Sequence, residues 1–338
     1  MKGDFDFMNN TKNIHLQLFA GDMNTQTTGG LSAEMKTYYG MELLENAKPQ
    51  LVHNQFAATK ALPVGGGKTV EWRKFGSFEE ALTPLTEGVT PDGSGISVSY
   101  ITKELAQYGD YTTVSDMLDL TAIDDVVLEI TDRHGANMGL TLDTVTRNEI
   151  LQGNQVIYAP HMDGTEITSR SQLDHLCRLT SGLVAYAAMQ LKKMNAPKID
   201  GKYICIIHPS VAFDLRMEPD WLNAHQYSAT TELFNGEIGE LHGVRFVEST
   251  EAKVWNEGKN GCAVYACLFL GKGAYGVVDL SEGTEVIVKP RGSSGTADPL
   301  DQRSTVGWKG IHAAAILYDE YMVRVECGSS SSGIDQAN

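Results

Sequence analysis

The chain has 338 residues, 42% of them hydrophobic and 21% charged, which is typical of a globular protein with more than one domain. Its formal net charge of −16 argues against a nucleic-acid-binding protein, because phosphate binding depends on Lys and Arg. No apolar run approaches the roughly 20 residues of a transmembrane helix, the acidic start argues against a signal peptide, and five scattered cysteines favour buried, reduced thiols.

The N-terminal region is polar except for residues 14–19, which form an apolar patch. We therefore predict a mobile arm over residues 1–30, with this patch available for docking. A short amphipathic helix and a second helical or extended piece are expected in residues 31–61.

Residues 69–75 and 97–105 alternate between side-chain types, which predicts two β-strands. The stretch between them is rich in Gly and Pro, so the pair is predicted to form a long hairpin within residues 62–116. A lone two-stranded ribbon is marginally stable in water, and we expect this one to lie on a neighbouring copy of the chain. The candidate intersubunit contact residues are Trp72, Arg73, Lys74, Phe75, Tyr100, Lys103 and Tyr108.

The longest regular pattern covers residues 118–152, where apolar side chains recur every three or four positions, with Thr121 as the expected N-cap. Such a helix would be a rod of roughly 45 Å that lies across a sheet or another helix. The apolar stripe comprises Ile123, Val126, Val127, Ile130, Met138, Leu142 and Val145. The opposite face, expected to meet solvent, carries Asp125, Glu129, Asp132, Arg133, Asp143 and Arg147.

Residues 166–285 mix helical and strand patterns, which predicts a compact α+β domain with a mixed sheet. One helix is expected from Ser169, whose spacing to Gln172 matches a capping box, to Met194. A second helix is expected over residues 210–217. Strands are predicted at residues 203–207, 244–248, 263–270, 275–280 and 285–289.

The last part of the chain is predicted to contain strands that return beneath the long helix, within residues 286–327. The apolar run 313–318 and the alternating run 321–326 are the strand candidates. The Ser- and Gly-rich tail, residues 328–338, offers no core and is predicted to be disordered.

Two glycine-rich stretches resemble nucleotide-binding loops without the helix that such loops need. Residues 65–69 end like a phosphate-binding loop, yet Leu62 stands where the first glycine is required, and a strand follows. Residues 271–276 match the dinucleotide fingerprint, and again a strand follows. A flexible hairpin base and a tight turn are the favoured interpretations.

The remaining chemical candidates are isolated. Cys205 and His208 have a metal-like spacing but no second pair follows, so zinc binding is disfavoured. His134 lies on the apolar stripe of the long helix and is expected to be a hydrogen-bonded core residue. Asp298 and Asp301 could hold a cation, but an ion-paired turn is favoured. We predict no metal, no cofactor and no enzymatic activity.

The order of the elements and several stretches of the chain resemble the major capsid protein of tailed bacteriophages. The stretches that carry the resemblance are residues 203–215, 235–249, 307–324 and, near the start, 14–20. The likeness spans roughly residues 30–326. It implies an α+β fold with an N-terminal arm, an extended β-hairpin loop, a peripheral domain with a long spine helix, and an axial α+β domain.

The resemblance divides the chain into seven segments. They are the mobile arm (1–30), the N-terminal helix or arm (31–61), the extended-loop hairpin (62–116), the peripheral domain with its spine helix (117–165), the axial domain (166–285), the returning strands (286–327) and the tail (328–338).

It also implies hexamers and pentamers that close an icosahedral shell around double-stranded DNA, without sequence-specific DNA binding and without a membrane. A scaffold protein, a portal and a decoration protein are implied partners, and the virion, assembled in the host cytoplasm, is the implied location. Some capsids of this fold join neighbours by a Lys–Asn bond, but no Asn and Glu matching Lys68, Lys74 or Lys103 are found, so no cross-link is predicted. Two alternatives remain open: an encapsulin-like nanocompartment subunit, and a soluble enzyme with an unrecognised site.

Overall fold

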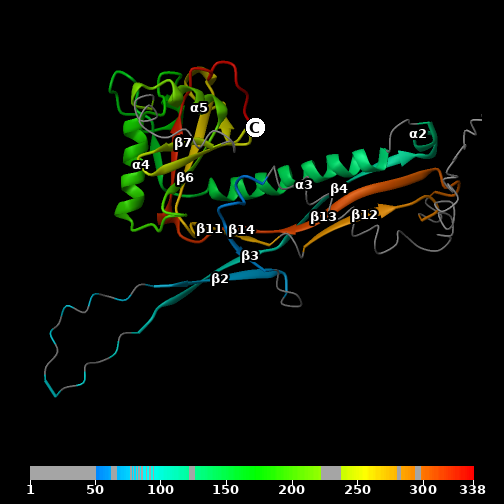
Figure 1. Cartoon of the computed structure of the whole chain (residues 1–338), viewed down its shortest axis with the longest axis horizontal. Helices are drawn as coiled ribbons and strands as arrows, with labels where there is room; N and C mark the ends of the chain where they lie inside the picture. Colours follow the sequence, from blue (N-terminus) through cyan, green and yellow to red (C-terminus); the bar gives the residue numbers. More distant parts are fainter. Residues whose placement is uncertain are drawn as a thin grey trace, which may run out of the picture.

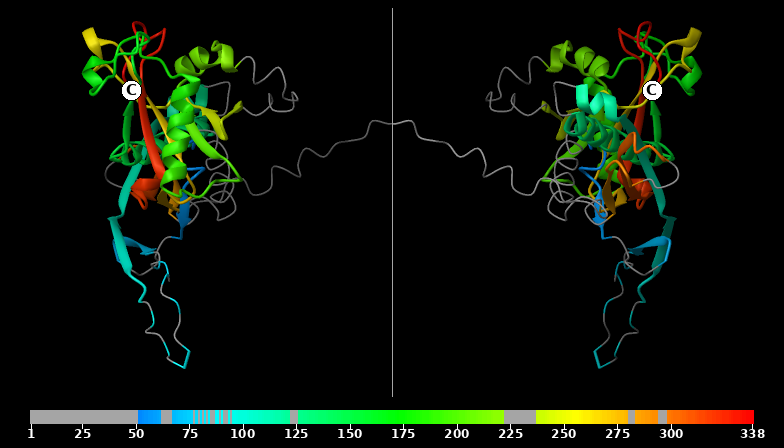
Figure 2. Two further views of the ribbon diagram at one scale, coloured as in Figure 1. Left: turned by 90° about the vertical axis from the view of Figure 1, so that its left-hand side faces the viewer. Right: turned by 90° about the vertical axis from the view of Figure 1, so that its right-hand side faces the viewer.

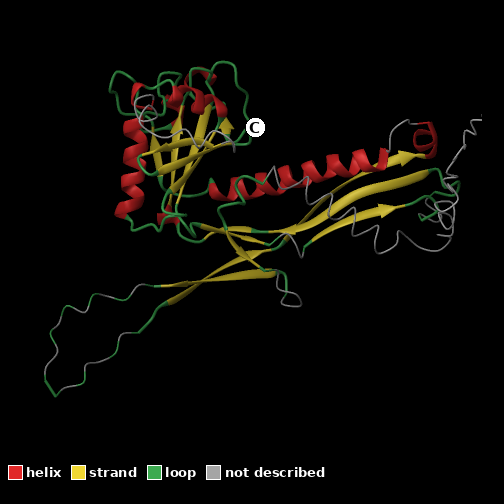
Figure 3. Cartoon of the chain, in the orientation of Figure 1, coloured by secondary structure: helices red, strands yellow, loops and turns green. Residues whose placement is uncertain are grey.

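The computed structural model describes residues 51–61, 67–76, 95–121, 126–221, 237–279, 283–293 and 298–338, with positions 78, 80, 82, 84, 87, 88, 90 and 93 between the second and third ranges. Figures 1 and 3 show a compact domain, an elongated body along a long helix, and a hairpin that leaves their junction. The predicted arm of residues 1–30, and the predicted helix up to residue 50, lie outside the described residues.

The compact domain is built on a seven-stranded sheet, covered by the helices α4 (Ser181–Lys193) and α5 (Pro209–Arg216). In spatial order the strands are β5 (Val156–Tyr158), β15 (Met322–Cys327), β10 (Val264–Leu270), β6 (Tyr203–Ile207), β8 (Val244–Glu248) and β7 (Glu237–Leu241), with β9 (Val254–Trp255) also paired to β10. All residues of β6 and β10 are buried, as expected for central strands covered on both faces. The sheet is mixed, as predicted, but the domain limits of 166–285 differ from the structure. Val156–Tyr158 and Met322–Cys327 join this sheet from outside that range, whereas Tyr275–Val278 and Thr284–Lys289 belong to other sheets.

The helix predicted over residues 169–194 is shorter in the structure. Residues Arg170–Gln172 form only a 3₁₀ turn, and Ser169 makes no side-chain cap. The helix α4 instead begins at Ser181, where the Thr180 side chain accepts a hydrogen bond from the Leu183 amide at 3.3 Å. Thr180, which was not predicted as a cap, is therefore the N-cap of this helix. Further 3₁₀ turns lie at Lys259–Gly261 and Asp319–Tyr321.

The elongated body consists of α3 (Val126–Ile150) and a three-stranded sheet with the order β12 (Thr284–Lys289), β13 (Arg303–His312), β4 (Ala106–Ser115). Trp308 of β13 packs on Met138 and Leu142 of α3, as predicted for a helix that lies across a sheet. The described helix is about 38 Å long at 1.5 Å per residue. Thr121 is not its N-cap, because Thr121 ends a separate short helix, α2 (Asp116–Thr121).

A short segment, residues 51–57, crosses α3 and buries part of the helix face that was predicted to meet solvent. We call this segment the strap. Asp143 is fully buried. Its Oδ1 accepts a hydrogen bond from the His53 amide at 2.7 Å, and its Oδ2 lies 2.6 Å from His53 Nδ1. Arg147 is also buried, and its guanidinium donates to the Glu251 carbonyl at 2.6 Å. The prediction of an exposed face is therefore wrong for these two residues, because segments that are distant in the sequence, around His53 and Glu251, cover them.

The strap continues into a small three-stranded sheet that joins the two parts. In this sheet β1 (Ala58–Lys60) pairs in parallel with β11 (Tyr275–Val278), which pairs with β14 (Ala314–Ile316). β11 and β14 begin where strands were predicted from the apolar runs.

The prediction that residues 321–326 return beneath the long helix is wrong. They form β15, which lies between β5 and β10 inside the compact domain, with Val325 fully buried. Of the predicted returning strands, β13 and β14 make the most extensive contacts with α3. An alternating strand pattern specifies a face to bury but not the sheet that it joins.

The tail of residues 328–338 is packed on the compact domain and is not disordered. Ser329 and Ser332 are buried, and Asp335 accepts hydrogen bonds from the hydroxyls of Ser210 and Tyr265. The Ser330 amide and hydroxyl donate to Asp214 at 2.7 and 2.6 Å. The tail is held by hydrogen bonds rather than by apolar burial, which is why its composition suggested disorder.

Four of the five cysteines are buried, as predicted, and Cys262 is half-buried. Burial raises the pKa of the Cys205 thiol well above its ordinary value, which keeps it protonated and unreactive. No helix in the described residues is both long and apolar enough to cross a membrane.

Candidate functional site

The predicted hairpin is present. β2 (Thr69–Phe75) pairs antiparallel with β3 (Val98–Glu104), from Thr69 opposite Glu104 to Phe75 opposite Val98. One further hydrogen bond, from the Gly76 amide to the Ser97 carbonyl at 2.8 Å, extends the pairing toward the tip. Figures 1 and 2 show the ribbon projecting away from both the compact domain and the elongated body.

The root of the hairpin is buried within its own chain. Val70 is fully buried and Trp72 is 7% exposed, and both pack against Val278, Ala313 and Ala315. The indole also lies directly on β11, where a Cβ at Gly276 would come within 2.7 Å of the Trp72 Nε1. The proposal of Trp72 as an intersubunit contact is therefore corrected, because its side chain is enclosed by residues of the same chain.

Two lysines of the hairpin also have partners in the same chain. Lys103 Nζ lies 2.6 Å from Glu149 Oε1 on α3. Lys74 Nζ lies 4.3 Å from the centroid of the Tyr318 ring, which itself stacks on Tyr321. These contacts tie the ribbon to the helix and to the loop after β14.

Tyr108 does not belong to the hairpin. It lies on β4 and packs against the cluster of Met138, Leu142 and Trp308. Three of the predicted contact residues remain open to solvent: Phe75 is 57% exposed, Tyr100 is 58% exposed, and the Arg73 guanidinium lies over the Tyr100 ring at 5.8 Å. A contact between these three and a neighbouring copy remains a prediction.

The far end of the hairpin combines exposed apolar side chains with negative charge. The described side chains of Phe78, Leu82 and Ile96 are largely exposed. The sequence from residue 76 to 97 contains four carboxylates (Glu79, Glu80, Glu87, Asp92) and no Lys or Arg. An apolar, acidic segment of this kind is typical of a surface that binds a partner.

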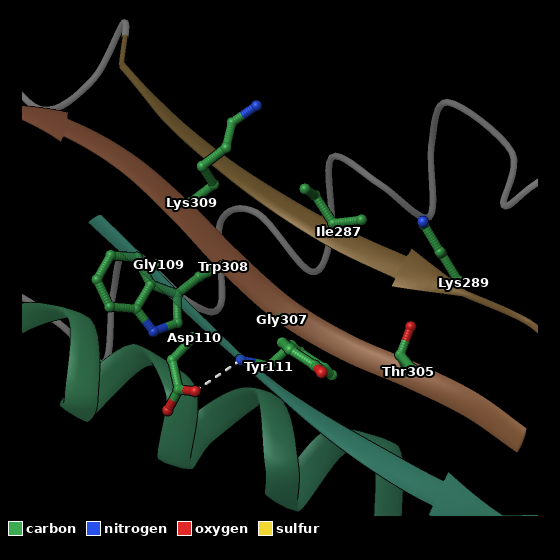
Figure 4. Close-up of a pocket in the computed structure, with 9 residues that line it drawn as sticks. All are labelled: Gly109, Asp110, Tyr111, Ile287, Lys289, Thr305, Gly307, Trp308 and Lys309. Carbon is green, nitrogen blue, oxygen red and sulfur yellow. Dashed lines mark hydrogen bonds between the residues drawn. The ribbon is translucent and has the colours of Figure 1, made fainter. Parts of the chain in front are cut away.

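A hollow of about 410 Å³ lies on the face of the three-stranded sheet that points away from α3 (Figure 4). Ile287, Gly307 and Tyr111 stand side by side across β12, β13 and β4 and form its centre. Glycine is required at the middle position, since a Cβ on Gly307 would lie 2.7 Å from the Asp110 carbonyl oxygen. The full lining comprises Gly109, Asp110, Tyr111, Ile287, Lys289, Thr305, Gly307, Trp308 and Lys309.

This hollow was not predicted from the sequence, although a signal was present. A glycine inside a strand often marks a close approach of another backbone or ligand, and both Gly109 and Gly307 lie inside strands. The signal is weak without the register, which places the two glycines two positions apart on neighbouring strands and therefore on the same face of the sheet.

The isolated chemical candidates have structural roles. Residues 271–274 form the turn between β10 and β11, in line with the predicted tight turn, and residues 275 and 276 begin β11. His208 Nδ1 accepts a hydrogen bond from the Ser210 amide at 3.2 Å and caps α5, while Cys205 is buried in β6.

His134 is buried as predicted, but its Nε2 has no hydrogen-bond partner among the described residues. Asp298 accepts the Arg303 amide at 2.8 Å, in line with the predicted turn. Residues 62–66, at the start of the glycine-rich base of the hairpin, lie outside the described residues.

The described part of the chain contains no group of three or more His, Cys, Asp or Glu side chains that could hold a metal ion. The exposed ribbon and the sheet hollow are its most distinctive surfaces.

Comparison with known proteins agrees with this architecture. A family model described as phage capsid protein matches residues 100–325. The capsid of Ralstonia phage GP4 superposes with a TM-score of 0.63 at 14% identity, covering 91% of this chain and 96% of that one. The capsid of cyanophage P-SCSP1u gives a TM-score of 0.62 at 15% identity, covering 83% and 89%. A virus-like particle from Pyrococcus furiosus gives a TM-score of 0.50 at 10% identity, covering 86% and 99%. Comparison with curated proteins gives no match.

The structural likenesses establish the fold, which is that of the tailed-phage capsids, and the family match covers about two thirds of the chain. The nanocompartment alternative is the weaker one, because the family model is that of phage capsids. The chain belongs to the phage capsid protein family and is a major capsid protein, a structural subunit of the virion shell.

Proposed function

We propose that the hairpin of each subunit lies on a neighbouring copy, and that the copies join into hexamers and pentamers that close the shell around double-stranded DNA. The single observation that carries this proposal is the exposed apolar tip. Leu82 is 80% exposed, and Phe78 and Ile96 are also open to solvent, beyond the paired strands of a ribbon whose described buried side chains, Val70 and Trp72, lie at its root. Exposed apolar surface of this kind gains free energy when a partner covers it.

The hollow on the three-stranded sheet is the proposed receiving surface. It offers the Tyr111 ring, the Ile287 side chain and the space above Gly307 to apolar groups of the tip. Lys289 and Lys309 at its edge complement the four carboxylates of residues 76–97. Charge complementarity of this kind favours one register of docking over others.

The proposal extends to the surroundings of the shell. A net charge of −16 supports a wall that encloses DNA without binding it tightly, since the 43 Asp and Glu residues outnumber the 27 Lys and Arg residues that could neutralise phosphate. A scaffold protein, a portal and a decoration protein are the proposed partners, the host cytoplasm is the proposed place of assembly, and the subunit has no catalytic role.

Deletion of residues 76–95 tests the role of the hairpin. The subunit is expected to fold and stay soluble, because Val70 and Trp72 of the root remain in place, but closed shells should not form. Electron microscopy of the purified protein and its thermal unfolding curve are the two measurements. Normal shells from the deleted chain would contradict the proposal, and nuclease-resistant DNA inside wild-type particles would distinguish a phage head from a nanocompartment.

A further inference from the structure

The hairpin is fixed to its own chain through three side chains. Trp72 is seated on β11 and β14, Lys103 is held by Glu149 of α3, and Lys74 lies over Tyr318 in the loop after β14. Beyond Phe75 and Val98, none of the described residues of the hairpin belongs to a core cluster or forms an ion pair or ring contact with the body. The ribbon is therefore held by contacts within its paired strands, and a rotation there would move its far end.

Along the ribbon, the two lysines lie on opposite sides of Trp72. Lys103 is opposite Val70, toward the root, and Lys74 is two positions beyond Trp72, toward the tip. Lys103 reaches the spine helix from β3, whereas Lys74 reaches the Tyr318 ring from β2. A ribbon fixed only at Trp72 could swing about that point, but contacts from both strands to two other elements restrict the swing. Lys103 and Glu149 are partly buried, with 41% and 17% of their side chains exposed, so solvent screens their attraction only in part.

A small swing at the root becomes a large movement at the tip. About 16 residues separate Trp72 from the tip, and an extended chain spans roughly 3.3 Å per residue, so the arm can reach about 50 Å. A rotation of about 10° at the root would then move the tip by roughly 9 Å. That distance is comparable to the width of the sheet hollow that is proposed to receive it, because the hollow crosses three strands that lie about 4.8 Å apart.

We propose that Lys103 with Glu149, and Lys74 with Tyr318, are positioning contacts that set the direction in which the hairpin leaves the body, and that this direction decides whether subunits close into uniform shells. The inference rests on the proposed docking of the hairpin on a neighbouring copy. It assigns the two lysines a role inside the subunit, in place of direct contact with a neighbour.

Charge exchange between Lys103 and Glu149 provides the test. The variant Lys103→Glu places two carboxylates together, and we expect at least a fivefold loss of closed, uniform particles, with open sheets or a broad spread of diameters instead. The double variant Lys103→Glu, Glu149→Lys restores the pair in reverse and should recover the wild-type yield to within about twofold. Lys103→Arg keeps the pair and should assemble normally. Particle diameters are measured by electron microscopy, and thermal unfolding of the dissociated subunit confirms that each variant is folded.

A matched control lies on the same helix. Arg133 and Glu129 form an exposed ion pair at 2.9 Å that does not contact the hairpin, so Arg133→Glu should leave closure unchanged. Equal loss in this control, or failure of the double variant to recover, would overturn the inference. Normal shells from Lys103→Glu would overturn it as well. If the deletion of residues 76–95 abolishes closure while Lys103→Glu does not, only the positioning role fails and the docking proposal stands.

The second contact gives an independent variant. Lys74→Met keeps the length and apolar stem of the side chain but removes the cation from the Tyr318 ring. A broader distribution of particle diameters is expected, and an unchanged distribution would remove Lys74 from the set of positioning residues.

Discussion

Replacement of Trp72 by Ala is expected to lower the free energy of unfolding of the isolated subunit by about 3–5 kcal/mol, the usual range for a large aromatic side chain removed from a core. The indole is 7% exposed, and the cluster of Val70, Val278, Ala313 and Ala315 encloses it. Its neighbours are mostly small and belong to paired strands, so they cannot move inward to fill the space that the ring leaves. Denaturant unfolding of dissociated subunits measures the loss.

Phe75→Ala is the matched control, because Phe75 lies three positions farther along the same strand and is 57% exposed. It should change the free energy of unfolding by no more than about 0.5 kcal/mol, as surface substitutions usually do. Its expected effect is on the yield of closed shells. Equal destabilisation by both variants would show that Phe75 is also enclosed within the subunit, and a stable Trp72→Ala subunit would contradict the position of the ring described here.

Acidification is expected to destabilise the subunit through His312. This side chain is 1% exposed, and burial lowers its pKa to about 4 despite the opposing influence of Asp143. In the unfolded chain the pKa is the ordinary 6.5, so between pH 6.5 and 4 the unfolded state binds a proton that the folded state does not. Stability therefore falls as the pH falls through this window, by up to about 3 kcal/mol at 1.36 kcal/mol per pKa unit.

The variant His312→Gln separates this contribution from all other titrating groups. A Gln amide can replace the contact of His312 Nε2 with the Thr146 hydroxyl, at 2.8 Å in the wild type, but it cannot gain a proton. Unfolding free energies of both proteins are measured from pH 7 to pH 4. The difference between the two curves should grow as the pH falls, and parallel curves would contradict a buried, neutral His312.

Local periodicity was sufficient to predict many strands. The alternation of residues 69–75 and 97–105, the short apolar run at 203–207 and the strand predicted at 244–248 correspond closely to β2, β3, β6 and β8. Each pattern is a direct consequence of side chains that point to opposite faces of a strand, or of a strand buried on both faces. The hairpin itself followed from two such strands with a glycine- and proline-rich connection.

Periodicity could not predict which distant segment would cover a given face. Asp143 is read from its helix as a solvent-facing carboxylate, but His53, 90 residues earlier, buries it. Trp72 is read from its strand as one face of an exposed ribbon, but Ala313 and Ala315 enclose it. The hollow around Gly307 likewise needs the register of three strands before its glycines can be recognised as one feature.

The sequence by itself determined the α+β class, the long helix, the projecting hairpin and, through the resemblance of several stretches, the capsid family. Each of these depends on neighbouring residues or on the order of elements along the chain. Only the tertiary structure decided which hairpin residues stay free for a neighbour, where β15 is inserted, and that the Ser-rich tail is packed. Those outcomes depend on contacts between residues far apart in the chain, such as Tyr275 and His53, where the Tyr275 hydroxyl donates to the His53 carbonyl across 222 positions. The free energy of such contacts comes from burial and pairing that exist only once the whole chain has folded.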